Sequence, residues 1–309
     1  PVQSLMLIAH GCTLQTLGLA VGAYAVAVIA AEVPTGIFAD LYGRKAAFLV
    51  SCALGALSCA VLLVSKSFYA AAGGLMLTGL GTAFASGSAD ALIIEETLAQ
   101  SGEAGLNKAV GAMRAFEGAG LMAGAIAGGL LPGARDYAAH ILVRMALCLA
   151  VGVFAWATLR ETRTAKREGM TLRTHLSGMG RMLLSGGDLP LVLCCTAAFA
   201  FAQFLLETYW QPGLTALTGA GFQAQLGILC AASFGAAAAG SFIIGRLKPA
   251  VGGRYWIGYL SLGGAAAALL FLLSLQRGTA GFAAVYIGVY LVIGMLSVVE
   301  QTIVNAQVS

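Results

Sequence analysis

The sequence predicts an all-α, polytopic membrane protein built as a bundle of transmembrane helices. Of its 309 residues, 59% are hydrophobic and only 10% are charged, whereas a soluble globular domain carries roughly a quarter charged residues. The apolar residues gather in nine long runs, and a helix needs about 20 such residues to cross a bilayer. These runs do not alternate apolar with polar residues, which excludes the strands of a membrane barrel.

The expected spans follow one another with short polar connections. An apolar stub, Pro1 to Ala9, comes first, and His10 to Thr13 form a loop after it. The 42 glycines lie mostly inside the apolar runs, as expected where small residues let membrane helices pack closely. The uncharged run from Thr208 to Gly245 is too long for one span, and Gln211-Pro212-Gly213 is the expected break. The nine spans are 14–38, 46–64, 68–92, 111–131, 138–159, 189–210, 223–245, 255–275 and 280–303.

Basic residues separate onto alternate sides of these spans. One side holds twelve Lys and Arg residues and the other holds three, with Arg114 and Arg144 in or at the edge of spans. By the positive-inside rule the first side faces the cytoplasm. We therefore expect an integral protein of the cytoplasmic (inner, plasma) membrane, with residues 160–188 as a basic cytoplasmic linker. Within this linker, residues 171–184 could instead form an amphipathic helix on the membrane surface. The twelve are Arg44, Lys45, Lys108, Arg160, Arg163, Lys166, Arg167, Arg173, Arg181, Arg246, Lys248 and Arg254.

Reactive side chains give no sign of a catalytic or metal centre. The seven cysteines are odd in number and contain no CxxC, and nearly all lie in apolar runs, so we interpret them as small packing residues. His10, His140 and His175 are far apart, and no HExxH occurs. The sequence thus predicts no enzyme activity, no cofactor, no metal and no nucleic-acid partner.

One motif is specific. It runs Gly36-Ile-Phe-Ala-Asp40-Leu-Tyr-Gly43-Arg44-Lys45 in the turn after the first span. Gly36 is expected to let two helices approach closely, and Gly43 to supply a backbone conformation that other residues reach at a cost. Asp40 is placed to face the positive N-terminal end of the next helix. A purely topogenic loop would explain the two cations but not the spaced glycines and the carboxylate.

This motif resembles the GxxxDxxGRR/K loop of the major facilitator superfamily. The resemblance implies a two-bundle fold in which the spans are roughly helices two to ten of twelve, with the chain incomplete at both ends. Residues 1–159 would be the N-terminal bundle, 160–188 the linker, and 189–309 a partial C-terminal bundle. In the family this loop acts as a cytoplasmic gate that pairs with acids at the end of helix four, which here are Asp90, Glu95 and Glu96.

A second pattern lies on the span at 111–131. Gly111, Gly120, Gly124, Gly128 and Gly129 follow the glycine motif associated with exporters of the same superfamily, many of them proton-coupled. Ala125 replaces the proline of that motif, and close helix packing alone is the alternative. Drug antiporters of the superfamily often have an arginine in helix four, a few residues before a GxG. Here the GxG is Gly79-Leu-Gly81, and the four residues before it, Leu75 to Thr78, include no arginine.

Ionisable groups inside spans are costly and mark candidate binding sites. Glu207, with Gln203 one turn away, is the first candidate for binding a proton or a cation, and an exposed interfacial acid is the alternative. Tyr209 and Trp210 beside it could belong to an aromatic belt. Arg114 and Glu117 are spaced to pair with each other or to contact substrate, and Glu300 near the cytoplasmic end of its span completes the candidates.

The leading hypothesis is therefore a monomeric secondary transporter that moves a small molecule by alternating access, with proton-coupled export as one mode. A membrane subunit of a multi-protein permease is the alternative, but no GxxxxGK[ST] occurs, so the ATPase would be a separate chain. An intramembrane enzyme would need clustered catalytic groups, which the sequence does not offer.

Overall fold

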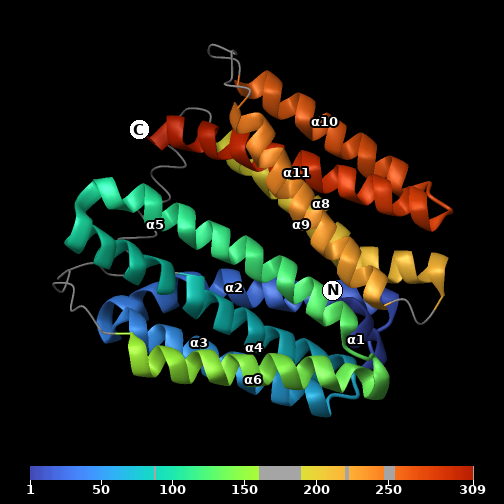
Figure 1. Ribbon diagram of the computed structural model, residues 1–309. Coiled ribbons are helices and arrows are strands. Elements are labelled where there is room, and N and C mark those ends of the chain that lie inside the picture. Colours follow the sequence, from blue (N-terminus) through green and yellow to red (C-terminus); the bar gives the residue numbers. More distant parts are fainter. Residues whose placement is uncertain (87, 160–188, 220–222, 247–254, 309) are drawn as a thin grey trace. The chain divides into compact units, whose positions relative to one another are not determined.

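The computed structural model describes residues 1–86, 88–159, 189–219, 223–246 and 255–308, and it confirms the all-α class (Figure 1). The linker at 160–188, the whole loop at 247–254 and the side chains of Glu95 and Glu96 lie outside the described residues. The helices are α1 (Gln3–Ala9), α2 (Leu14–Tyr42), α3 (Arg44–Val64), α4 (Phe68–Ser86), α5 (Ala89–Leu130), α6 (Ala134–Thr158), α8 (Leu189–Thr218), α9 (Gln223–Arg246), α10 (Tyr255–Ser274) and α11 (Thr279–Val308).

Seven helices of the described chain are long and apolar enough to cross a membrane. They are Leu14–Tyr42, Arg44–Val64, Phe68–Ile94, Tyr137–Thr158, Ala224–Arg246, Ile257–Ser274 and Thr279–Ile303. They coincide with seven of the nine expected spans. The other two, 111–131 and 189–210, are helical almost throughout as parts of α5 and α8 but are not among the seven.

Two helix boundaries differ from the expectation. α8 does not break at Pro212 but continues to Thr218, and it ends at Gly219, whose φ is +79°. A break at Pro212 would leave further backbone groups unbonded in an apolar setting, so helix persists past the proline. The helix that begins with Ala89 has no assigned interruption up to Leu130, and its ribbon turns back on itself (Figure 1).

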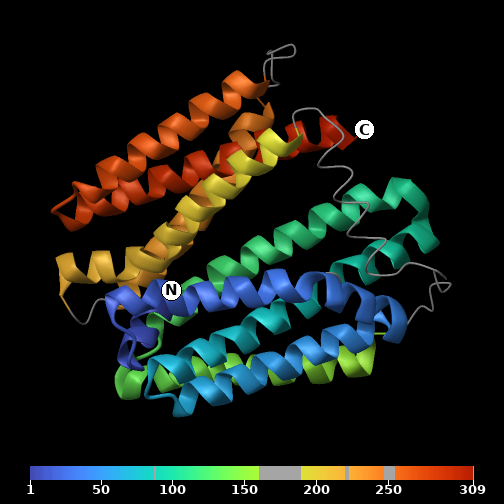
Figure 2. The same cartoon turned by 180° about the vertical axis from the view of Figure 1, so that it is seen from behind.

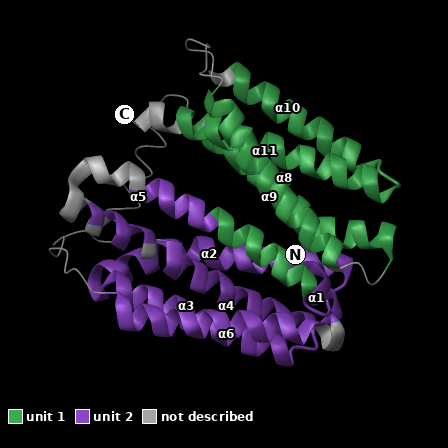
Figure 3. Cartoon of the chain, in the orientation of Figure 1, with its two compact units in different colours: residues 1–2, 118–130, 180–309 green, residues 3–117, 131–179 purple. Residues whose placement is uncertain are grey.

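The described chain forms two compact units (Figure 3). Unit 2 contains residues 3–117 and 131–179, and unit 1 contains residues 1–2, 118–130 and 180–309. α5 contributes its first part to unit 2 and its last part to unit 1. The division into transport bundles at 160–188 remains a prediction.

Unit 2 is built on α4, which packs against both α2 and α3, while α3 also packs against α6. Two glycines of α4 make these contacts possible. A Cβ built on Gly79 would lie 2.5 Å from the carbonyl oxygen of Tyr24 on α2, and one on Gly81 would lie 3.3 Å from that of Ser51 on α3. The Gly79-Leu-Gly81 sequence thus lets α4 pack closely against α2 on one face and against α3 on another.

Unit 1 is built on α11, which packs against α8, α9 and α10; α10 and α11 run side by side in both views (Figures 1 and 2). The α9–α11 crossing is close because Gly240 faces the Leu291 carbonyl and Gly294 faces the Ala237 carbonyl, each with no room for a Cβ. Ser241 donates a hydrogen bond of 2.9 Å to the carbonyl of Gly294 across the same crossing.

Two cysteines pack between helices, as the sequence predicts for small apolar residues. All seven lie in the described chain as free thiols. Two of them fill glycine notches between α3 and α6: the Cys148 sulfur lies 3.1 Å from a Cβ built on Gly55, and the Cys52 Cβ lies 3.2 Å from one built on Gly152.

The close α9–α11 crossing predicts that Gly294→Val destabilises unit 1, because the new side chain overlaps the Ala237 carbonyl. Overpacking of this kind costs about 1–3 kcal/mol. Thermal unfolding in detergent should show a lower Tm for Gly294→Val. Gly264→Val on α10 is the matched control, since no described atom lies within 4 Å of its Cβ position; equal losses in both variants would contradict the crossing.

Candidate functional site

In the Gly36–Lys45 motif, a single residue, Gly43, connects α2 to α3. Its φ of 102° and ψ of 151° lie in a region that is essentially restricted to glycine. Its N–H donates to the Ala39 carbonyl at 2.9 Å, which closes the end of α2. The expectation for Gly43 is confirmed.

Gly36 does not have the predicted role within unit 2. It is exposed on α2, and no described atom lies within 4 Å of its Cβ position. The expected close approach of another helix at Gly36 is therefore wrong for the described residues.

Asp40 lies within the last turn of α2, not in a loop, and its side chain is exposed. A carboxylate near the C-terminal end of a helix is disfavoured by the dipole of its own helix. The position therefore does not stabilise α2, which is consistent with a functional use of the charge.

Lys45 binds the end of α6. Its Nζ donates to the carbonyl oxygens of Trp156 at 2.8 Å and Leu159 at 2.6 Å. A cation at the C-terminal end of a helix satisfies carbonyls that have no intrahelical partner and is favoured by the helix dipole. The motif thus connects the α2–α3 turn to the helix that leads into the linker.

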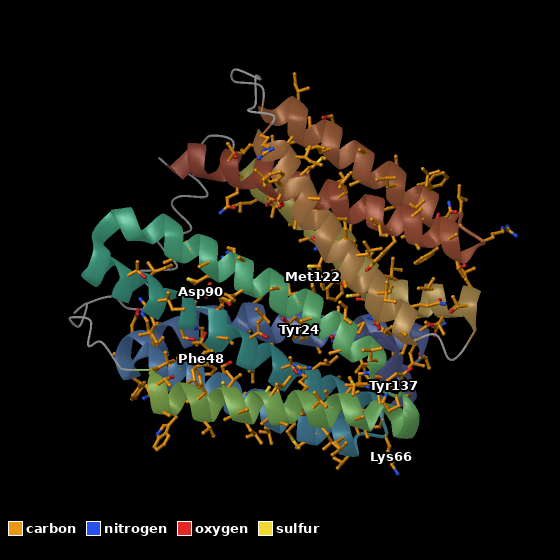
Figure 4. The ribbon with its side chains drawn as sticks, viewed as in Figure 1. Tyr24, Phe48, Lys66, Asp90, Met122 and Tyr137 are labelled. Carbon is orange, nitrogen blue, oxygen red and sulfur yellow. The ribbon has the colours of Figure 1, made fainter. Side chains whose placement is uncertain are left out.

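Asp90 lies in the first turn of α5 and is exposed. Figure 4 shows Asp90 and Phe48 toward one end of unit 2 and Lys66 and Tyr137 toward the other. Phe48 follows the Gly43 turn in α3, so Asp90 and the motif belong to the same end. The gate pairing of Asp90, Glu95 and Glu96 with Arg44 stays a prediction.

Arg114 and Glu117 pair with each other. The Arg114 Nη1 and Glu117 Oε2 atoms are 2.7 Å apart, and the two side chains are 67% and 55% exposed. Within unit 2 the pairing alternative is the one observed.

The glycines of the exporter-like motif lie on α5 and fall into two groups. Gly111, Gly120 and Gly124 have no described atom within 4 Å of their Cβ positions. In unit 1, by contrast, a Cβ built on Gly227 of α9 would lie 2.6 Å from the Ala125 carbonyl and 2.7 Å from the Gly129 Cα. Gly128 is close to Pro1. Among the described residues, packing contacts are found at the end of the motif, and they include Ala125, where the family motif has proline.

Glu207 and Gln203 lie on α8 in unit 1. Glu207 is exposed and Gln203 is half-buried. Trp210 on the same helix is 3% exposed and packs on Tyr286 of α11, with ring centroids 4.9 Å apart. Trp210 is therefore part of the core of unit 1 and not of an aromatic belt.

Glu300 on α11 is partly buried and accepts a hydrogen bond of 2.6 Å from Thr196 Oγ1 of α8. Tyr259 of α10, 5% exposed, interacts with Glu300 and Thr196. Leu296 and Ile303 form a hydrophobic cluster with Tyr259 one turn to either side of Glu300. Three helices thus place a carboxylate and two hydroxyls together beside an apolar cluster.

One intramembrane acid was missed as a candidate. Glu32 on α2 accepts a hydrogen bond of 2.9 Å from Ser86 Oγ of α4. Its sequence signal was present, because Glu32 is the first charged side chain in the chain and stands inside an apolar run.

The long apolar helices, the glycine turn of the motif and the carboxylates within the helices are features expected of a membrane transporter. The family model described as Major Facilitator Superfamily matches residues 1–309, and the chain belongs to that family. In fold it is similar to the crystal structure of the nucleoside transporter NupG, in a mutant form, with a TM-score of 0.81 and 15% identity over 100% of this chain and 78% of that chain. No curated protein matches the sequence.

The backbone of Gly43 predicts that Gly43→Ala destabilises the protein by about 2 kcal/mol, because a Cβ is strained at this φ and ψ. Gly36→Ala is the matched control in a helix interior, where alanine is favoured over glycine by about 0.5–1 kcal/mol. Chemical or thermal unfolding in detergent compares the two. A Gly43→Ala protein as stable as the Gly36→Ala protein would contradict the described turn.

The two bonds of Lys45 predict that Lys45→Met loosens the end of α6. Amide hydrogen exchange over residues 155–159 should become about tenfold faster, since a hydrogen bond to a charged group contributes about 1.5–3 kcal/mol. Lys66→Met at the other end of unit 2 should leave these amides unchanged. Unaltered exchange in Lys45→Met would show that the cation does not hold α6.

Proposed function

We propose that the protein is a secondary active transporter that moves a small molecule by alternating access, with the Gly36–Lys45 segment as its cytoplasmic gate. The observation that supports this most is the α2–α3 turn: a glycine-only backbone at Gly43, an exposed acid one turn earlier, and a lysine that binds the end of α6. A one-residue connection makes α2 and α3 move together, and the lysine extends that coupling to α6.

The proposal includes coupling to protons through an acid in unit 1. Glu300 is the better supported acid, because its carboxylate is held by Thr196 from another helix. Glu207 remains a candidate with Gln203 beside it, since an exposed acid in a membrane helix requires a partner or an aqueous cavity. Protonation would remove the charge and weaken the charge-assisted bond to Thr196, which alters the α8–α11 contact.

Export is the proposed direction, in a cytoplasmic membrane with the linker 160–188 on the cytoplasmic side and the chain acting as a monomer. The sequence pattern of Gly111, Gly120, Gly124, Gly128 and Gly129, which follows the exporters' glycine motif, is the support for export. The charge asymmetry of the loops supports the orientation.

Substrate flux in liposomes tests the coupling. With an imposed proton gradient, Glu300→Gln and Glu207→Gln should be compared with the wild type over a panel of small molecules. Loss of at least tenfold in gradient-driven flux in one variant, with substrate exchange retained, identifies the coupling acid.

Ser274→Ala is the control for this experiment, because that hydroxyl bonds only within its own helix, to the Phe271 carbonyl. Gradient-driven flux that survives in both acid variants would contradict coupling through unit 1.

A further inference from the structure

His10 joins two connections of unit 2 that are far apart in the sequence: the α1–α2 turn (residues 10–13) and the α3–α4 turn (residues 65–67). Its Nδ1 atom lies 2.8 Å from the carbonyl oxygen of Ser65. Both residues are buried, with 6% and 3% of their surfaces exposed. A carbonyl oxygen only accepts, so the ring donates, and both the neutral Nδ1–H tautomer and the protonated ring supply this N–H. His10 therefore bonds the two turns in either charge state.

Both turns lie at the end of unit 2 opposite the Gly36–Lys45 motif. α2 runs from the α1–α2 turn to Gly43, and α3 runs from Gly43 to the α3–α4 turn. Figure 4 shows Lys66, in the second of these turns, at the other end of unit 2 from Asp90. The motif and the His10 contact thus lie at opposite ends of the same helices.

The α1–α2 turn has a fixed backbone of its own. The N–H of Cys12 donates to the Leu7 carbonyl at 3.0 Å across Gly11, whose φ is +98°. This arrangement is the Schellman ending of a helix, in which glycine takes the left-handed position. Thr13 then begins α2 with a capping box that it forms with Thr16. The turn is therefore a defined structure between two capped helix ends.

The α3–α4 turn is also capped, and it fits closely against Gly11. Ser67 Oγ accepts a hydrogen bond of 3.3 Å from the N–H of Ala70 in the first turn of α4. A Cβ built on Gly11 would lie 3.2 Å from the Lys66 carbonyl oxygen and 3.3 Å from the Ser67 Cα. Two rigid turns therefore meet directly, and the imidazole of His10 supplies the hydrogen bond between them.

The His10 bond satisfies a backbone group that α3 leaves open. Ser65 is the C-cap of α3, and the last carbonyls of a helix have no partner within it. Because Ser65 is buried, loss of the imidazole N–H would leave this carbonyl without that donor in a place where an unmet acceptor is costly. The bond also connects α1 to α3 and α4, whereas α1 itself packs against α2 and α6.

We propose that His10 is a positioning residue whose bond to Ser65 holds the α1–α2 turn on the α3–α4 turn, and that transport requires this His10 latch to stay closed. The end of unit 2 opposite the motif then moves as one body, as Lys45 makes the other end do by binding α6. The effect on transport rests on the proposed function, whereas the existence of the latch does not.

Cys12 reports on the latch, because it lies two residues after His10 and is a free thiol with 4% exposure. The protein in detergent is treated with N-ethylmaleimide, and the labelling rate of each cysteine is measured by mass spectrometry. We expect His10→Ala to label Cys12 at least about tenfold faster than the wild type, as loss of a buried hydrogen bond implies. Cys59 on α3, with 0% exposure, should keep its wild-type rate, which distinguishes local opening from unfolding. Equal Cys12 rates in the two proteins would overturn the proposal.

His10→Asn and His10→Gln separate the hydrogen bond from the presence of a polar side chain. The amide nitrogen of asparagine, like the imidazole Nδ1, is bonded to Cγ, so it can donate from nearly the same place, whereas the glutamine nitrogen lies one bond further out. We expect His10→Asn to label Cys12 at close to the wild-type rate and His10→Gln to behave like His10→Ala. Equal rates in the Asn and Gln variants would show that the bond to Ser65 does not hold the turns together.

Substrate flux in liposomes tests the consequence for transport, over the panel of small molecules used for the acid variants. We expect His10→Ala to lower flux at least about tenfold with and without a proton gradient, and His10→Asn to restore most of it. Wild-type flux in a His10→Ala protein whose Cys12 labels faster would overturn the requirement for a closed latch. A wild type without any flux would instead count against the proposed function, and the labelling of Cys12 would still decide on the latch.

Discussion

A lipid interior offers no hydrogen-bond partners, and the structure depends on meeting that constraint. Backbone groups are satisfied by continuous helix, even past Pro34 in α2 and Pro212 in α8. Because lipid is as apolar as the side chains, burying them between helices stabilises a membrane protein little. Close packing of helix backbones at small residues holds the helices together instead. The contacts at Gly79 in unit 2 and at Gly240 and Gly294 in unit 1 are the result. Hydroxyl groups add bonds across the same crossings, as Ser241 does to Gly294.

The same constraint singles out the acids. Among the described residues, each unit has a carboxylate that accepts a hydrogen bond from a hydroxyl of a neighbouring helix: Glu32 from Ser86 in unit 2 and Glu300 from Thr196 in unit 1. Such a bond offsets part of the cost of an ionised carboxylate in a membrane helix.

The sequence was sufficient for features that depend on local backbone chemistry. Apolar run length predicted the helices, and Gly43 in the motif predicted a glycine conformation at the turn. Features that depend on distant parts of the chain were not accessible: Lys45 meets α6 carbonyls more than 100 residues away, and Thr196 meets Glu300 over a separation of 104 residues. The expected break at Pro212 was wrong because local propensity competes with the need to keep backbone groups bonded, and Gly219 provides the better end. Gly36 was expected to support a close contact that the described residues do not make.

We propose that this member of the major facilitator superfamily moves a small molecule against its gradient by using protons. The most direct measurement is uptake of a labelled compound into liposomes with an imposed pH difference, before and after a protonophore is added. We expect the compound to accumulate above its external concentration, and this accumulation to collapse when the protonophore dissipates the pH difference. Accumulation that persists without the pH difference, or movement that only ever equalises the two sides, would contradict it.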